Sequence, residues 1–133
     1  MIKTLSIKNL GPIPQMQSGD LGAINLIIGP NQSGKTFVLK ALYSALKTVE
    51  QYKRGKEIRT DKEILSDKLY WTFQSSELGN IVRKGENSMS FTMTSEDNEE
   101  FTYSFGPSTV KQANIDKNTF LPRSSNTVFI PAK

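Results

Sequence analysis

The sequence predicts an α/β fold with a mixed β-sheet over the whole chain, residues 1–133, and three patterns predict it. An apolar run at residues 24–28 leads into a glycine-rich loop, and an apolar stripe with helical spacing follows that loop. Short segments at residues 3–8, 89–94 and 101–105 alternate between apolar and polar residues, which is typical of half-buried strands. No internal repeat or linker divides the chain, and its length suits one domain.

The composition excludes several classes of site. The chain has no cysteine and no histidine, so disulfides, thiolate or histidine metal sites and Ser-His-Asp triads are impossible. No stretch approaches the roughly 20 apolar residues that a membrane helix needs. The residues after Met1 alternate like a strand and do not resemble a signal peptide. We therefore expect a cytoplasmic protein that does not enter a membrane.

The charge is mildly positive. Lysine and arginine total 17 against 13 aspartates and glutamates, which gives a formal charge of +4, and the positive residues are spread along the chain. A solvated basic surface is the first interpretation. A nucleic-acid footprint is the alternative, and DNA is therefore a candidate partner.

Two strands are predicted before the glycine-rich loop. Leu5 and Ile7 alternate with polar residues over residues 3–8. Gly11, Pro12 and Pro14 predict a break, followed by about ten residues of loop. The second strand, residues 24–28, is nearly all apolar, which predicts a strand covered on both faces in a parallel or mixed sheet.

A helix is predicted directly after the loop. Its apolar residues fall at i, i+1, i+4, i+7, i+8 and i+11 and would form one buried stripe. Lys53 and Arg54 suit the C-terminal end of its dipole, and Gly55 is predicted to stop it. The stripe consists of Val38, Leu39, Leu42, Ala45, Leu46 and Val49.

A second helix is predicted to begin at a capping box formed by Thr60 and Glu63. The segment "LYWTF" at its end also has strand propensity, so that alternative stays open. The predicted buried side of this helix consists of Ile64, Leu65, Leu69, Thr72 and Phe73.

A β-hairpin is predicted around the turn "SEDNE". Both of its strands carry apolar residues on one face, which predicts a core position, and base stacking by its aromatic residues is the alternative. Residues 106–126 are polar and predicted to be irregular, and "TVFIPA" at 127–132 is predicted to be a last short strand. The apolar face consists of Met89, Phe91, Met93, Phe101, Tyr103 and Phe105.

The glycine-rich loop "GPNQSGKT" at residues 29–36 has the spacing G-x-x-x-x-G-K-[ST]. A loop of this kind between a strand and a helix binds triphosphates, because backbone N–H groups and the helix dipole both face the negative charge. Gly29 and Gly34 would let the backbone approach the phosphates, Lys35 would reach the β- and γ-phosphates, and the Thr36 hydroxyl would ligate Mg²⁺. The predicted nucleotide-binding residues are Gly29, Pro30, Asn31, Gln32, Ser33, Gly34, Lys35, Thr36 and Phe37.

Four segments carry a family resemblance. They are "IKTLSIKNLGPI", "GAINLIIGPNQSGKT", "FVLKALYSAL" and the closing "VFIPAK". The chain resembles the N-terminal lobe of ABC-type ATPase heads, in the branch of SMC proteins, RecF- and RecN-like repair ATPases and OLD-like bacterial ATPases. The resemblance implies a P-loop NTPase fold, ATP and Mg²⁺ as ligands, and an ATP-dependent head dimer. It also implies a C-terminal lobe in the same or a second chain, and work on DNA in repair, chromosome handling or phage defence.

The chain departs from that family in its catalytic motifs. The Walker B strand of such heads is four apolar residues followed by Asp, and none of the 13 acids has this context. Asp67 follows "ILS" and Asp20 follows "QSG". The LSGGQ-like signature and the switch histidine are also missing. Gln112 is a candidate for the family's Mg²⁺-contacting glutamine, with an ordinary surface glutamine as the alternative. We expect no catalytic residue here, and ATP binding without turnover.

Three other functions compete with this one. An ABC transporter ATPase subunit usually has an aromatic residue before the P-loop, and residues 1–28 contain no Tyr or Phe. A small nucleic-acid-binding module with a non-hydrolytic P-loop is a second alternative, although Lys35 and Thr36 are intact. A self-sufficient small kinase or GTPase would need base-specificity motifs such as N-K-x-D, and the chain has none.

Overall fold

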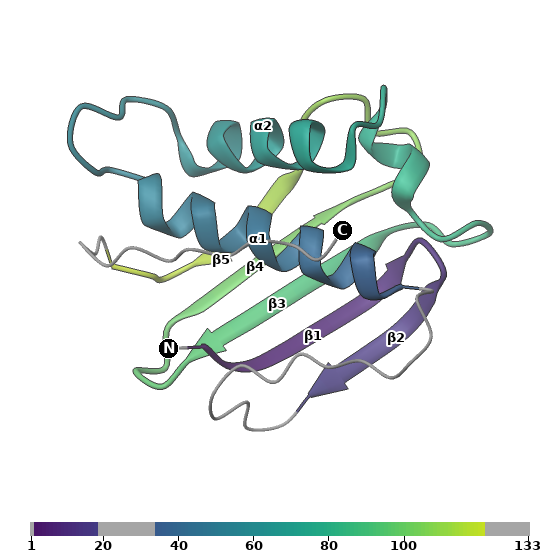
Figure 1. The fold of residues 1–133 in the computed structure, drawn as a ribbon, viewed down its shortest axis with the longest axis horizontal. Helices are drawn as coiled ribbons and strands as arrows, with labels where there is room; N and C mark the ends of the chain where they lie inside the picture. The colour runs from purple at the N-terminus through teal and green to yellow at the C-terminus, as the bar shows by residue number, and fades with distance from the viewer. Residues whose placement is uncertain (1, 19–33, 122–133) are drawn as a thin grey trace.

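The computed structural model describes residues 2–18 and 34–121, and it has two layers (Figure 1). One layer is a five-stranded antiparallel sheet with the strand order β2-β1-β3-β4-β5. The other is formed by α1, which lies across one face of the sheet, and by α2, which packs alongside α1 (Figure 1). The α/β class predicted from the sequence is confirmed at this level.

The elements follow one another along the chain without a domain boundary in the described ranges. In order, they are β1 (Ile2–Leu10), β2 (Ile13–Ser18), α1 (Lys35–Gln51), α2 (Asp61–Phe73), the 3₁₀ turn η1 (Leu78–Ile81), β3 (Met89–Ser95), β4 (Glu100–Phe105) and β5 (Asn114–Asn118).

The predicted hairpin is β3 and β4, and its aromatic face is core. Phe91 pairs directly with Tyr103, and their rings stack with centroids 4.8 Å apart. Phe101 and Phe105 flank Tyr103 on the same strand, and all four rings are buried. The core interpretation is therefore confirmed over base stacking, because a buried ring cannot present its face to a base.

Tyr103 also fixes the helix layer on the sheet. Its hydroxyl donates a hydrogen bond to the carbonyl oxygen of Ala41 in α1, at 3.2 Å. Burial raises the pKa of this phenol, so the group stays neutral and keeps its proton for the bond. The contact joins residues that are 62 positions apart in the chain.

Helix α1 confirms the predicted stripe. Val38, Leu42, Ala45 and Leu46 are buried in the core that α1 shares with the sheet, and Val49 is partly buried against it. Leu39 is also buried. The predicted end of the helix is wrong. It stops at Gln51 with Tyr52 as its C-cap, because Lys53 already has a left-handed φ of 57°. Lys53, Arg54 and Gly55 thus lie beyond the last turn.

Helix α2 confirms the capping box. The Thr60 hydroxyl accepts a hydrogen bond from the Glu63 amide at 3.1 Å, and the Glu63 carboxylate accepts one from the Thr60 amide at 3.0 Å. The "LYWTF" segment is helical. Of the predicted buried side, Ile64, Leu65 and Leu69 are buried, whereas Thr72 and Phe73 are only half-buried.

Two strands were not predicted. Residues 13–18 form β2 and pair antiparallel with β1 where a loop was expected, and residues 114–118 form β5 where irregular chain was expected. Both are the outer strands of the described sheet, where Pro14 costs no ladder hydrogen bond and a buried apolar face is not required. All described strand pairs are antiparallel. The strands predicted at 24–28 and 127–132 lie outside the described residues.

A close approach between two backbones fixes the turn η1. A Cβ atom at Gly79 would lie 2.0 Å from the carbonyl oxygen of Pro107, and the Gly79 amide donates to the carbonyl oxygen of Thr109 at 2.8 Å. We expect Gly79→Ala to lower the free energy of unfolding by about 2–3 kcal/mol, because backbone must move to admit the methyl group. Urea denaturation measures the loss.

Gly55→Ala is the matched control for this substitution. Gly55 has a left-handed φ of 61° but nothing within 4 Å of the added Cβ, so only the conformational cost of about 1 kcal/mol applies. Equal losses in the two variants would contradict the steric explanation at Gly79.

Candidate functional site

The predicted nucleotide-binding residues divide between described and undescribed chain. Gly29, Pro30, Asn31, Gln32 and Ser33 lie outside the described residues. Gly34 is the N-cap of α1, and Lys35, Thr36 and Phe37 form the first turn of that helix. A helix therefore begins directly after the second glycine of "GPNQSGKT", as the sequence predicts.

Gly34 occupies a position that only glycine fits without strain. Its φ of 86° and ψ of −23° are left-handed, and a Cβ there would lie 2.7 Å from Cγ1 of Ile13. Its carbonyl oxygen accepts the first intrahelical bond, from the Val38 amide at 2.9 Å. The glycine thus lets the chain turn into α1 while pressed against the start of β2.

The N-terminal ends of the two helices differ in their partners. In α2, Thr60 caps the helix, and Asp61 and Glu63 place negative charge in the first turn. In α1, no cap side chain bonds to the helix and the first turn contains no acid. The amides of Lys35, Thr36 and Phe37 have no carbonyl partner within the helix, and among the described residues no side chain compensates the positive end of its dipole. This geometry favours an anion.

The side chains of Thr36 and Phe37 lie in different environments. Thr36 is exposed, which leaves its side chain accessible at the helix start. Phe37 is half-buried, with its ring 5.7 Å from that of Phe73 at the end of α2. A Cβ at Gly11 would lie 2.5 Å from the Phe37 ring, so this ring also rests on the β1–β2 turn. The Phe37 side chain is thus an anchor, and its predicted role in phosphate binding falls to its backbone amide.

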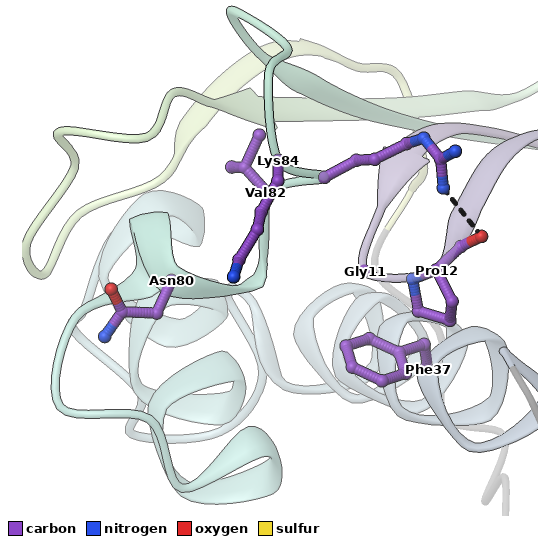
Figure 2. Close-up of a pocket in the computed structure, with 7 residues that line it drawn as sticks. Gly11, Pro12, Phe37, Asn80, Val82 and Lys84 are labelled. Atoms are coloured by element: carbon purple, nitrogen blue, oxygen red, sulfur yellow. Dashed lines mark hydrogen bonds between the residues drawn. The ribbon is translucent and has the colours of Figure 1, made fainter.

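An open pocket of about 470 Å³ adjoins this first turn. Figure 2 shows Phe37 and Pro12 on one side of the pocket, and Asn80 and Lys84 on the other. Its lining consists of Gly11, Pro12, Phe37, Asn80, Val82, Arg83 and Lys84. Among its described lining residues, the pocket combines apolar walls with two cations, Arg83 and Lys84, and no acid.

The sequence analysis did not predict Arg83 and Lys84 as site residues, because pairing between distant segments of the chain places them beside the start of α1. The Arg83 amide donates to the Asn9 carbonyl oxygen at 2.9 Å, and Leu10 forms an isolated bridge with Val82. Arg83 also donates through Nη1 to the Pro12 carbonyl oxygen at 2.9 Å, the bond that is dashed in Figure 2. The sequence offered one weak signal, the adjacent charges of Arg83 and Lys84.

The described residues bring no carboxylate cluster to the pocket. Asp67 lies on α2 and forms an ion pair with Arg59 at 2.8 Å, and Asp20 is outside the described ranges. No group of three or more acidic side chains that could hold a metal occurs in residues 2–18 and 34–121. Gln112 is exposed and precedes β5, at the edge of the described sheet opposite β2.

Within the described parts of the chain, neither helix is both long enough and apolar enough to span a bilayer.

A double-mutant cycle tests the contact between Gly34 and Ile13. We expect Gly34→Ala to cost about 1–2 kcal/mol from the left-handed backbone, and more from the collision with Ile13. Ile13→Ala removes the colliding atoms, so it should cost about 1 kcal/mol less in the Gly34→Ala background than alone. Urea denaturation of the four proteins gives the coupling. Strict additivity would mean that Gly34 does not lie against Ile13.

Comparison with known proteins does not assign the chain to a family. Neither the protein-family models nor the curated proteins with which the sequence was compared give a match. The ligand of the site therefore has to be inferred from the loop sequence, the start of α1 and the pocket beside it.

Proposed function

We propose that the chain binds Mg²⁺–ATP at the glycine-rich loop and the start of α1. The observation that carries this proposal is the sequence "GPNQSGKT" running directly into a helix whose first residue is Lys35 and whose N-cap is the left-handed Gly34. This is the order of loop and helix that a Walker A site requires. The first turn, which has no capping side chain and no acid, and the described pocket lining, which contains two cations, both favour a negatively charged ligand.

Each residue of the proposed site has one task. The loop amides from Asn31 to Phe37 would donate hydrogen bonds to phosphate oxygens, and the dipole of α1 would add positive potential. The Lys35 ammonium would neutralise charge on the β- and γ-phosphates, and the Thr36 hydroxyl would be a Mg²⁺ ligand. The bound Mg²⁺ would offset the charge of the triphosphate oxygens.

The adjoining pocket suits the remainder of the nucleotide. Phe37 and Pro12 offer an apolar wall, and Arg83 and Lys84 add positive charge near the phosphates. Arg83 is held by Pro12, so its guanidinium is already positioned before a ligand arrives. A preorganised cation costs less side-chain entropy on binding.

The wider function follows from the resemblance to ABC-type heads. We infer that the fold is the N-terminal lobe of a P-loop NTPase of the SMC, RecF, RecN and OLD-like branch. A C-terminal lobe in the same or a second chain would complete the ATPase, which would form an ATP-dependent dimer and act on DNA. The antiparallel hairpin β3–β4, which pairs with β1 in the sheet, is compatible with such a lobe.

Lys35→Ala tests nucleotide binding. Its loss removes a charge-assisted phosphate contact worth on the order of 1.5–3 kcal/mol, so affinity for Mg²⁺–ATP should fall roughly 10- to 100-fold. Isothermal titration calorimetry measures the dissociation constant of Mg²⁺–ATP for the parent chain and for Lys35→Ala. Lys3→Ala is the matched control, because Lys3 is exposed at the end of β1 away from the Gly11 turn. Equal affinities for the Lys35→Ala and parent chains would refute the site.

The 133-residue chain should hold ATP without hydrolysing it. Phosphoryl transfer to water needs a positioned water and charge stabilisation across the γ-phosphate. No acid in the sequence has Walker B context, and Lys35 and Thr36 supply only part of the machinery. We expect steady-state phosphate release no greater than that of Lys35→Ala. Turnover by the parent chain that disappears in Lys35→Ala would show that one of the 13 acids activates water.

A further inference from the structure

Helix α2 carries large apolar residues on two sides. Ile64, Leu65 and Leu69 are buried, whereas Tyr70 is 42% exposed and Trp71 is 71% exposed. The two exposed rings meet edge to face, with centroids 5.4 Å apart and planes at 86°, so each ring restricts the movement of the other. The helix packs alongside α1 at the margin of the fold (Figure 1). Its exposed aromatic side therefore suits contact with another molecule, because tryptophan and tyrosine are enriched in protein interfaces.

Two hollows adjoin the exposed rings, and Tyr70 and Trp71 line both of them. The first has a volume of about 280 Å³ and a mostly apolar surface, and the second has a volume of about 330 Å³ and a more polar surface. The amide of Ala113 donates to the Ser66 hydroxyl at 3.1 Å, which holds the segment that carries Lys111 against α2. The other lining residues are Gln74, Ser75 and Ser76 in the first hollow, and Ser66, Asp67 and Lys111 in the second.

The second hollow contains one side chain of each charge, Asp67 and Lys111. The Arg59 guanidinium donates to Asp67 at 2.8 Å, but it also donates to both carboxylate oxygens of Glu57, at 2.9 and 3.0 Å. One cation shared by two carboxylates leaves the charge of Asp67 only partly offset. Lys68 precedes Trp71 by three residues and adds a cation on that side of α2. Lys111 is exposed and forms no ion pair within residues 2–18 and 34–121.

We propose that this surface, the α2 patch formed by Tyr70, Trp71 and the linings of the two hollows, binds a second copy of the chain in a two-fold dimer. Each Trp71 would enter the apolar hollow of the other copy, and each Lys111 would meet the Asp67 of the other copy. Burial of both indoles at the centre would supply most of the affinity.

Self-complementarity of the patch favours a second copy over other partners. In a two-fold contact the same surface serves both copies, so it must contain both halves of every interaction. The α2 patch has an indole beside an apolar hollow, and it has a carboxylate and an ammonium group in one hollow. An unrelated protein would need only one half of each pair on this chain, and a nucleic acid would meet the Asp67 carboxylate.

This dimer goes beyond the proposed function and does not rest on it. The α2 patch lies on α2 and on the segment before β5, whereas the nucleotide site lies at the start of α1. The two sites share no residue, so we expect the dimer to form without nucleotide and with an equal dissociation constant in Lys35→Ala.

Sedimentation equilibrium of the full chain measures the dimer. Trp71→Ala should raise its dissociation constant by about 30-fold or more, as expected for an indole at the centre of an interface. Trp71 is the only tryptophan, so its emission should shift to shorter wavelength as the chain concentration rises through the dissociation constant. Ile58→Ala is the matched control, because Ile58 is 94% exposed but precedes the start of α2, whereas Trp71 lies near the end of that helix. It should leave the dissociation constant unchanged.

A charge exchange tests the two-fold geometry. Asp67→Lys and Lys111→Glu should each raise the dissociation constant at least about 10-fold, because each places like charges together at two points of the contact. An equal mixture of the two variants should associate again. In the mixed dimer, both points of contact pair a lysine with an acid.

Five results would overturn the proposal. A chain that stays monomeric up to about 1 mM would do so, as would equal dissociation constants for Trp71→Ala and the parent. A mixture of the charge variants that associates no better than either variant alone would exclude the two-fold pairing. Equal weakening by Ile58→Ala and Trp71→Ala would place the contact elsewhere. A dimer that forms only with Mg²⁺–ATP would belong to the nucleotide site, and would leave the proposed function standing without the α2 contact.

Discussion

Two glycines and two apolar side chains interlock where α1 begins, and the candidate site depends on that contact. Gly34 lies against the Ile13 side chain, and Gly11 lies against the Phe37 ring, with hypothetical Cβ distances of 2.7 and 2.5 Å. Each segment thus supplies a glycine to make room for the other's side chain. Both glycines have a left-handed φ, which disfavours residues with a Cβ atom. Each position therefore requires glycine for two reasons, the backbone conformation and the lack of space for a side chain.

The interlock sets what the start of α1 can contact. It holds the uncapped first turn beside the β1–β2 turn, and the same β1 end pairs with residues 81–83 through backbone hydrogen bonds. Arg83 and Lys84 are thereby carried next to the first turn, although they lie nearly 50 positions further along the chain. An anion at this helix start would meet backbone amides and cations that the fold has already positioned.

Local sequence patterns correctly predicted the elements that are stabilised by contacts between residues close together in the chain. The stripe of α1, the Thr60–Glu63 capping box and the alternation around Phe91 and Tyr103 each report a contact within a few residues or across one turn. Strands β2 and β5 escaped prediction because each is outermost among the described strands, where a strand needs no apolar face. The pocket escaped because its lining comes from the β1–β2 turn, α1 and residues 80–84, which only the pairing of Leu10 with Val82 brings together.

The composition of those two outer strands has a consequence for association between copies of the chain. An outer strand offers unpaired N–H and C=O groups on which another strand can build, and flat apolar edges seed aggregates in this way. In β2, Pro14 removes one such donor, and in β5 the exposed charges of Asp116 and Lys117 oppose close stacking of identical strands. The polar character that hid β5 from prediction thus protects the sheet from uncontrolled growth at that edge.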